Sequence, residues 1–101
     1  MQEQAIYDPT MDNLLRYSPE LVGEYLASCF ELSNEPGGQE ALLMALRQFA
    51  EAQGVNDVAK VAGMPPKSLR QALSVNGNPT LKTLLAILRG LRLKLSASRR
   101  E

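Results

Sequence analysis

Residues 58–73 read VAKVAGMPPKSLRQAL, and this stretch contains two short helical patterns separated by a glycine. Ala59 lies four residues before Gly63, and Leu69 lies six residues after it. A small residue at Ala59 allows two helices to cross closely, Gly63 suits a tight left-handed turn, and Leu69 can anchor the second helix. Ordinary packed helices can share this spacing, so two packed helices without a helix-turn-helix remain an alternative. The stretch predicts a helix-turn-helix at about residues 55–74.

Two adjacent prolines mark the front of the second short helix, KSLRQAL at residues 67–73. Pro66 suits the first helical position, because the amide that it lacks would be unpaired there and its fixed φ favours the helical start. The Asn- and Gly-rich loop SVNGNP follows at residues 74–79. The sequence therefore predicts a short helix bounded by a proline pair and a turn.

Three longer amphipathic patterns surround this pair of helices. Residues 18–32, 39–53 and 80–91 each place apolar side chains at the spacing of one helix face. After residue 92, leucine alternates with polar residues, which is typical of a brief strand and makes residues 93–97 a candidate C-terminal β-strand. We therefore expect an all-α fold with an extra N-terminal helix and this candidate strand.

The formal net charge of zero conceals two oppositely charged halves. Residues 1–54 contain nine acidic and two basic residues, a net charge of −7, whereas residues 55–101 contain nine basic and two acidic residues, a net charge of +7. A basic half suits a phosphate-binding surface, and an acidic half suits a basic protein partner. The alternative is two solvated faces of uneven charge.

The composition disfavours an enzyme, a metal site and a secreted protein. The chain has no histidine and one cysteine, so the commonest general base and metal ligand are missing and no intramolecular disulfide can form. We interpret Cys29 as a small core residue in a reducing compartment. The longest apolar runs, ALLMAL and LLAIL, are far shorter than the roughly 20 residues of a membrane span. We expect a cytoplasmic binding protein without metal or cofactor.

Residues 58–95 resemble the HigA-like antitoxins, the addiction module antidote proteins with a helix-turn-helix, a family that includes prophage DNA-binding proteins. The glycine turn, the Ala72-Leu73-Ser74 run and the Gly77-Asn78-Pro79 run match the pattern of that family. The Tyr-Asp-Pro at residues 7–9 and the Tyr25-Leu26 pair are also similar, so the resemblance covers most of the chain.

The resemblance implies a lambda-repressor-like helix-turn-helix bundle with two partners. Proteins of this kind neutralise a small RelE/ParE-type (HigB) toxin that is encoded beside them, and they repress their own operon by binding its operator DNA. Five positions differ from the usual residues of the family. The family usually has a polar pair where this chain has Pro65-Pro66, and usually a tyrosine where it has Arg70. It often has a glutamine where this chain has Asp57 and a glycine where it has Arg92.

Nine residues are candidate contacts to double-stranded DNA. Those on the outward face of residues 67–73 are expected to face the major groove, and those in the following loop and the start of the next helix are expected to contact phosphates, as in similar repressors. The nine are Lys67, Ser68, Arg70, Gln71, Ser74, Asn76, Asn78, Thr80 and Lys82.

Charge also suggests a division of the chain into two parts. Residues 1–34 form an acidic segment with an amphipathic helix, and residues 35–101 form the helix-turn-helix domain. The candidate toxin contacts on the first segment are Leu21, Glu24, Tyr25 and Phe30. The alternative is that this helix completes the core of the domain.

A single short recognition helix reads few base pairs, so we expect a homodimer on an inverted repeat, with half-sites roughly 34 Å apart. Residues 93–97 could pair with their symmetry mate or fold onto their own domain. Two further functions stay open: a prophage-type regulator without a toxin, and a helix-turn-helix scaffold that binds protein and has lost DNA binding.

Overall fold

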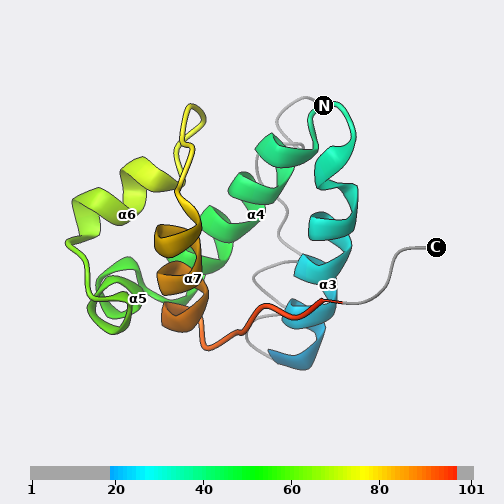
Figure 1. Ribbon diagram of the computed structural model, residues 1–101. Coiled ribbons are helices and arrows are strands. Elements are labelled where there is room, and N and C mark those ends of the chain that lie inside the picture. Colours follow the sequence, from blue (N-terminus) through cyan, green and yellow to red (C-terminus); the bar gives the residue numbers. More distant parts are fainter. Residues whose placement is uncertain (1–18, 98–101) are drawn as a thin grey trace.

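The computed structural model describes residues 19–97 of the 101-residue chain, and all regular structure in this part is helical. In Figure 1, α4 lies between α3 on one side and the group of α5, α6 and α7 on the other. The prediction of an all-α fold is confirmed, and each of the five observed α-helices overlaps a stretch that the sequence predicted to be helical. The elements are α3 (Pro19–Glu31), the 3-10 helix η1 (Leu32–Asn34), α4 (Gly38–Gln53), α5 (Val55–Ala62), α6 (Pro66–Ala72) and α7 (Leu81–Gly90).

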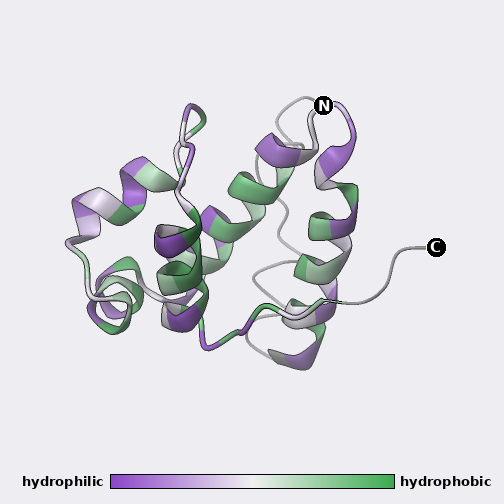
Figure 2. Cartoon of the chain, viewed as in Figure 1, coloured by the Kyte–Doolittle hydropathy of each residue, from purple (hydrophilic) through white to green (hydrophobic). Residues whose placement is uncertain are grey.

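The core lies between α4 and the three shorter helices. Its large, fully buried side chains come from α4, α5, α6 with its C-cap, and α7, so each of these helices contributes at least one. In Figure 2, α4 carries hydrophobic bands along most of its length, whereas α6 shows several hydrophilic bands. The fully buried large residues are Phe49, Leu46, Leu69, Leu73, Ile87 and Val58.

Helix α3 packs against α4 and extends this core. Val22 and Leu26 are buried, and the ring of Tyr25 meets Phe49 edge-on, with ring centroids 6.0 Å apart at an interplanar angle of 86°. Such aromatic pairs contribute about 0.5–1.5 kcal/mol beyond the burial of their area. The boundary at residue 34 therefore separates regions of different charge that share one core.

Helices α5 and α7 cross at a distance that only a glycine allows. A Cβ atom added at Gly90 would lie 2.5 Å from the carbonyl oxygen of Val58 and 2.9 Å from its Cγ1. The Gln53 side chain, at the end of α4, donates from Nε2 to the carbonyl oxygen of Gly90 (3.2 Å). The Gly90 backbone thus contacts both α5 and α4.

The end of α7 turns the chain back across α3. The Arg92 N–H donates to the Arg89 carbonyl (2.9 Å) and the Leu93 N–H donates to the Leu88 carbonyl (2.8 Å), which together form a Schellman motif. Arg92 occupies the left-handed position of this motif, with φ of 62°. This conformation costs a residue with a Cβ atom roughly 1–2 kcal/mol, so a glycine suits the position better.

The strand predicted at residues 93–97 is wrong for the described chain, since residues 19–97 contain no strand. A strand needs a neighbouring strand to satisfy its backbone groups, and this segment instead crosses helix α3 (Figure 1). Leu93 is half-buried against the core and approaches Gly23 of α3. Alternation of leucines alone did not distinguish a strand from an extended tail.

Replacing Gly90 with alanine tests the close crossing. Although alanine favours a helix, the new Cβ would collide with the Val58 backbone, so we expect Gly90→Ala to destabilise the protein by about 1–3 kcal/mol. Gly23→Ala is the matched control, because a Cβ there would meet its nearest neighbour, Leu93 Cδ2, at 4.0 Å, and should stabilise by up to about 1 kcal/mol. Urea unfolding measures the free energy of unfolding of both variants, and equal changes in the two would contradict the close crossing of α5 and α7.

Replacing Leu26 with alanine tests whether α3 belongs to the core. Leu26 is 3% exposed, so Leu26→Ala should lower the free energy of unfolding by about 2–5 kcal/mol. Leu21 lies on the same helix but is 42% exposed, and Leu21→Ala should change it by about 0.5 kcal/mol or less. Similar thermal midpoints for the two variants would mean that α3 is not held in the core.

Candidate nucleic-acid interface

Helices α5 and α6 form a tight helix-turn-helix around Gly63. Gly63 has a φ of 76°, its N–H donates to the Lys60 carbonyl (3.2 Å), and the Met64 N–H donates to the Ala59 carbonyl (3.0 Å). These bonds satisfy carbonyl groups that the end of α5 would leave unpaired. Ala59 and Leu69 are each 1% exposed, so both lie inside the two-helix unit, as expected for its structural residues.

Helix α6 presents one polar face to solvent. Pro65 precedes it with an extended φ and ψ of −66° and 149°, and Pro66 is its first residue. Leu69 and the C-cap residue Leu73 are buried. The exposed side chains of the helix are those that the sequence placed outward: Lys67, Ser68, Arg70 and Gln71.

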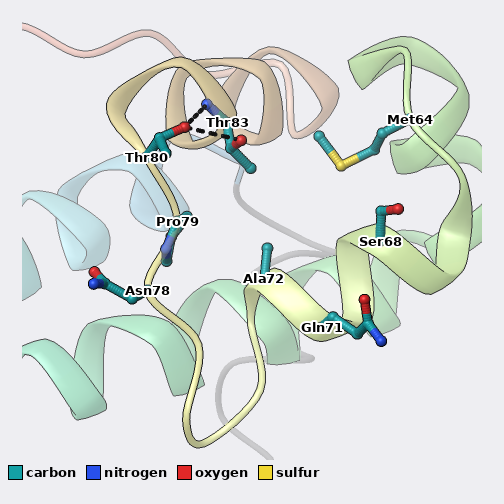
Figure 3. Close-up of a pocket in the computed structure, with 8 residues that line it drawn as sticks. All are labelled: Met64, Ser68, Gln71, Ala72, Asn78, Pro79, Thr80 and Thr83. Atoms are coloured by element: carbon teal, nitrogen blue, oxygen red, sulfur yellow. Dashed lines mark hydrogen bonds between the residues drawn. The ribbon is translucent and has the colours of Figure 1, made fainter.

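A groove of about 420 Å³ lies between α6 and the start of α7. Figure 3 shows its lining side chains, which come from α6, the turn before it, and the loop and first turn of α7. Four of the nine candidate DNA contacts meet here, and they are Ser68, Gln71, Asn78 and Thr80. The other lining residues, which the sequence did not single out, are Met64, Ala72, Pro79 and Thr83.

The start of α7 borders this groove and is capped by Thr80. Thr80 Oγ1 accepts a hydrogen bond from the Thr83 N–H (3.1 Å) and lies 3.1 Å from Thr83 Oγ1, both drawn in Figure 3. The cap satisfies one of the free amides at the helix start and leaves the others available. A helix start with free amides, next to Lys82 on its first turn, suits an anionic group.

Arg70 lies on another edge of α6. It lines a second pocket, of about 550 Å³, where α4 meets α5, and this pocket also contains the carboxylates of Glu51 and Asp57. Two nearby carboxylates attract a guanidinium and repel phosphate. The structure therefore separates Arg70 from the groove that Ser68 and Gln71 line.

The remaining candidates lie around the groove but do not line it. Lys67 is exposed on α6, Asn76 is exposed in the loop, and Lys82 is exposed on α7. Ser74 is half-buried, and its hydroxyl donates to the Gln71 carbonyl (2.9 Å), so it closes the end of α6. These four residues belong to α6, the loop after it and the first turn of α7.

Two residues that hold this face in place could not be identified from local sequence patterns. Arg47 of α4 donates from Nη1 to the Leu73 carbonyl (2.8 Å), and Gln53 of α4 bonds the Gly90 carbonyl. The partners lie 26 and 37 positions apart in the chain, beyond the reach of helical periodicity. Only the folded arrangement brings them together.

The candidate toxin contacts on α3 separate into two groups. Tyr25 and Phe30 are half-buried and pack against the core, whereas Leu21 and Glu24 are exposed. On the outer face, three exposed carboxylates fall at four- and seven-residue intervals, which places them in one row along the helix. The row consists of Glu20, Glu24 and Glu31.

Within residues 19–97, no three side chains of His, Cys, Asp or Glu are grouped to hold a metal ion. Burial raises the pKa of the Cys29 thiol, which disfavours the reactive thiolate. None of the helices between these residues is long and apolar enough to cross a membrane.

Comparison with known proteins places these features in a family. The chain matches, over residues 10–99, the family described as "Probable addiction module antidote protein". It is also 36% identical over 55 residues to an uncharacterized protein of Haemophilus influenzae, an alignment that covers 54% of this chain and 57% of that relative. No solved structure matches the chain. Because the family match extends over nearly all of the sequence, the chain belongs to the addiction module antidote proteins.

Proposed function

We propose that this antidote protein binds operator DNA through the groove between α6 and α7 and neutralises a basic toxin of the RelE/ParE (HigB) type. The observation that carries the DNA-binding part is the meeting of Ser68, Gln71, Asn78 and Thr80 in one exposed groove. Hydroxyl and amide side chains of this kind bond to base edges and to phosphates. The proposed activity is binding in the cytoplasm, with repression of the chain's own operon as its outcome.

Charge supports the same assignment. Lys67 and Lys82 are exposed on either side of the groove, on α6 and on the first turn of α7. Lysines next to a groove of polar side chains provide the general attraction to phosphate that holds a protein on DNA, while polar groups select the sequence. In this proposal the lysines supply affinity, and Gln71 and Ser68 supply specificity.

The size of α6 favours a two-fold dimer on DNA. The helix has seven residues, which at 1.5 Å per residue is about 10 Å long and spans only a few base pairs. Two copies on an inverted repeat, with half-sites roughly 34 Å apart, would read enough bases to specify an operator. Residues 93–97 cross α3 of their own chain, which favours folding of this segment onto its own domain over pairing with its symmetry mate.

A second candidate is a helix-turn-helix scaffold that binds protein but not DNA. Two observations favour it: the carboxylates of Asp57 and Glu51 share a pocket with Arg70, and prolines remove backbone donors from the start of α6. A carboxylate beside the recognition helix repels phosphate. The two candidates differ in one measurable property, the affinity for DNA from upstream of the gene.

The toxin-binding part of the proposal rests on the outer face of α3. The inner face of this helix is occupied by the core, which leaves Leu21 and the row of Glu20, Glu24 and Glu31 exposed. RelE/ParE-type toxins tend to be basic because they act on polyanionic targets, so a row of carboxylates would steer such a partner toward α3.

A single substitution in the groove tests DNA reading. Gln71→Ala should weaken operator binding by about 1–3 kcal/mol if the amide bonds a base, while binding to unrelated DNA stays nearly unchanged. Gln39→Ala, an equal change at an exposed glutamine on α4, is the control. Fluorescence anisotropy with the upstream DNA measures both, and wild-type protein without any preference for this DNA would favour the scaffold.

Charge removal on α3 tests toxin recognition. The pair Glu24→Gln and Glu31→Gln should slow association with the purified product of the adjacent reading frame by roughly tenfold at low salt, with less effect at high salt. The pair Glu51→Gln and Asp57→Asn removes the same charge elsewhere and serves as the control. Equal association rates for the two pairs, measured by surface plasmon resonance, would contradict a role for the α3 row.

A further inference from the structure

The two ends of α6 are held by different means. Its front follows the Gly63 turn, in which the N–H groups of Gly63 and Met64 donate to carbonyl groups of α5. Its rear is fixed to α4, because Nη1 of Arg47 donates to the carbonyl oxygen of Leu73 at 2.8 Å. With seven residues, α6 is too short to be stable alone, so it depends on these attachments together with the burial of Leu69 and Leu73.

The chemistry at the rear of α6 suits an arginine. The last carbonyl groups of a helix lack intrahelical partners and carry partial negative charge, so a cationic donor there is favourable. Arg47 is half-buried, which reduces the screening of its charge by water. Its planar guanidinium can point one N–H at the Leu73 carbonyl and retain donors for other groups.

The Leu73 carbonyl lies where α6 ends and the loop at residues 74–79 begins. Directly after it, the N–H and hydroxyl of Ser74 both donate to the Gln71 carbonyl, and the Gly77 N–H donates to the Ser74 carbonyl (2.8 Å). The direction in which this turn leaves the helix sets where Asn78 lies relative to Gln71. The hydrogen bond to the Leu73 carbonyl therefore affects the positions of both walls of the groove.

We infer that Arg47 is a positioning residue for DNA recognition: through the Leu73 carbonyl it fixes the tilt of α6 and the exit of the loop, and so aligns Gln71 with Asn78. This inference rests on the proposed function. Arg47 does not line the groove, so it acts through α6 and not as a ligand of DNA. The Arg47 bond also connects the end of α6 directly to α4, the helix on which α3 packs.

Two variants of Arg47 test the inference. Arg47→Met keeps an apolar stem but removes the charge and the donors, and should lower operator affinity roughly tenfold without changing affinity for unrelated DNA or the slope of affinity against salt. Arg47→Lys retains a cationic donor and should recover part of the loss. Arg89→Met, at an exposed arginine in the last turn of α7, controls for net charge.

Hydrogen exchange in the free protein supplies a readout that does not need DNA. Arg47→Met should speed exchange of the Leu73, Ser74 and Gly77 amides, while the Leu84 and Leu91 amides of α7 keep their protection. If wild-type protein has no preference for the operator, the proposed function fails, and the exchange rates alone then decide whether Arg47 positions α6.

Two other results would overturn the inference. Equal weakening of operator and unrelated DNA, with a salt slope smaller by about one, would make Arg47 a phosphate ligand. A lower thermal midpoint with an unchanged ratio of operator to unrelated affinity, and unchanged exchange at Leu73 to Gly77, would make it a residue of general stability.

Discussion

The backbone contact between α5 and α7 at Gly90 is the constraint on which the rest of the structure depends. Because Val58 presents its carbonyl and Cγ1 where a side chain at residue 90 would be, the two helices are locked at a distance that side-chain packing alone would not reach. Helix α5 in turn carries α6 through the Gly63 turn, and α7 carries the capped start that forms the other wall of the groove. The geometry of the groove thus depends on Gly90, at the C-terminal end of α7.

Helix α3 shows how one amphipathic helix serves two environments. Its apolar residues complete the core beside Phe49, and its carboxylates form a row on the outside. Burial of the apolar face supplies the stability that a 13-residue helix lacks in isolation. The acidic exterior then projects from a rigid support, so a charged partner would meet it without first ordering a flexible segment.

Much of this fold could be predicted from local signals. The periodicity of apolar residues located five helices, and Gly63 and Pro66 marked two of their ends, the first through its left-handed φ and the second through its missing amide. Periodicity identifies the face that must be covered, but not what covers it. For that reason it did not show that Tyr25 and Phe30, two candidate toxin contacts, also pack against the core, or that the tail at residues 93–97 lies against α3 without forming a strand.

The candidate site was predictable only in part for a related reason. The outward residues of α6 follow from the position of Leu69, and all four of them are exposed. Which of these side chains meet Asn78 and Thr80 depends on how α7 crosses α5, and the pocket that Arg70 shares with Glu51 and Asp57 forms only where α4 meets α5. Long-range contacts such as Arg47 with Leu73 leave no trace in a single sequence.

The anchoring of α6 by two leucines has an evolutionary consequence. Leu69 and Leu73 hold the helix in the core, while its outward side chains support little of the fold. Substitutions at such exposed positions usually change stability by about 0.5 kcal/mol or less, a small share of the roughly 5–15 kcal/mol that keeps a domain folded. If α6 binds operator DNA as proposed, duplicated copies of this gene could diverge in the DNA that they bind while keeping one scaffold, so that paralogues in one genome would not cross-regulate.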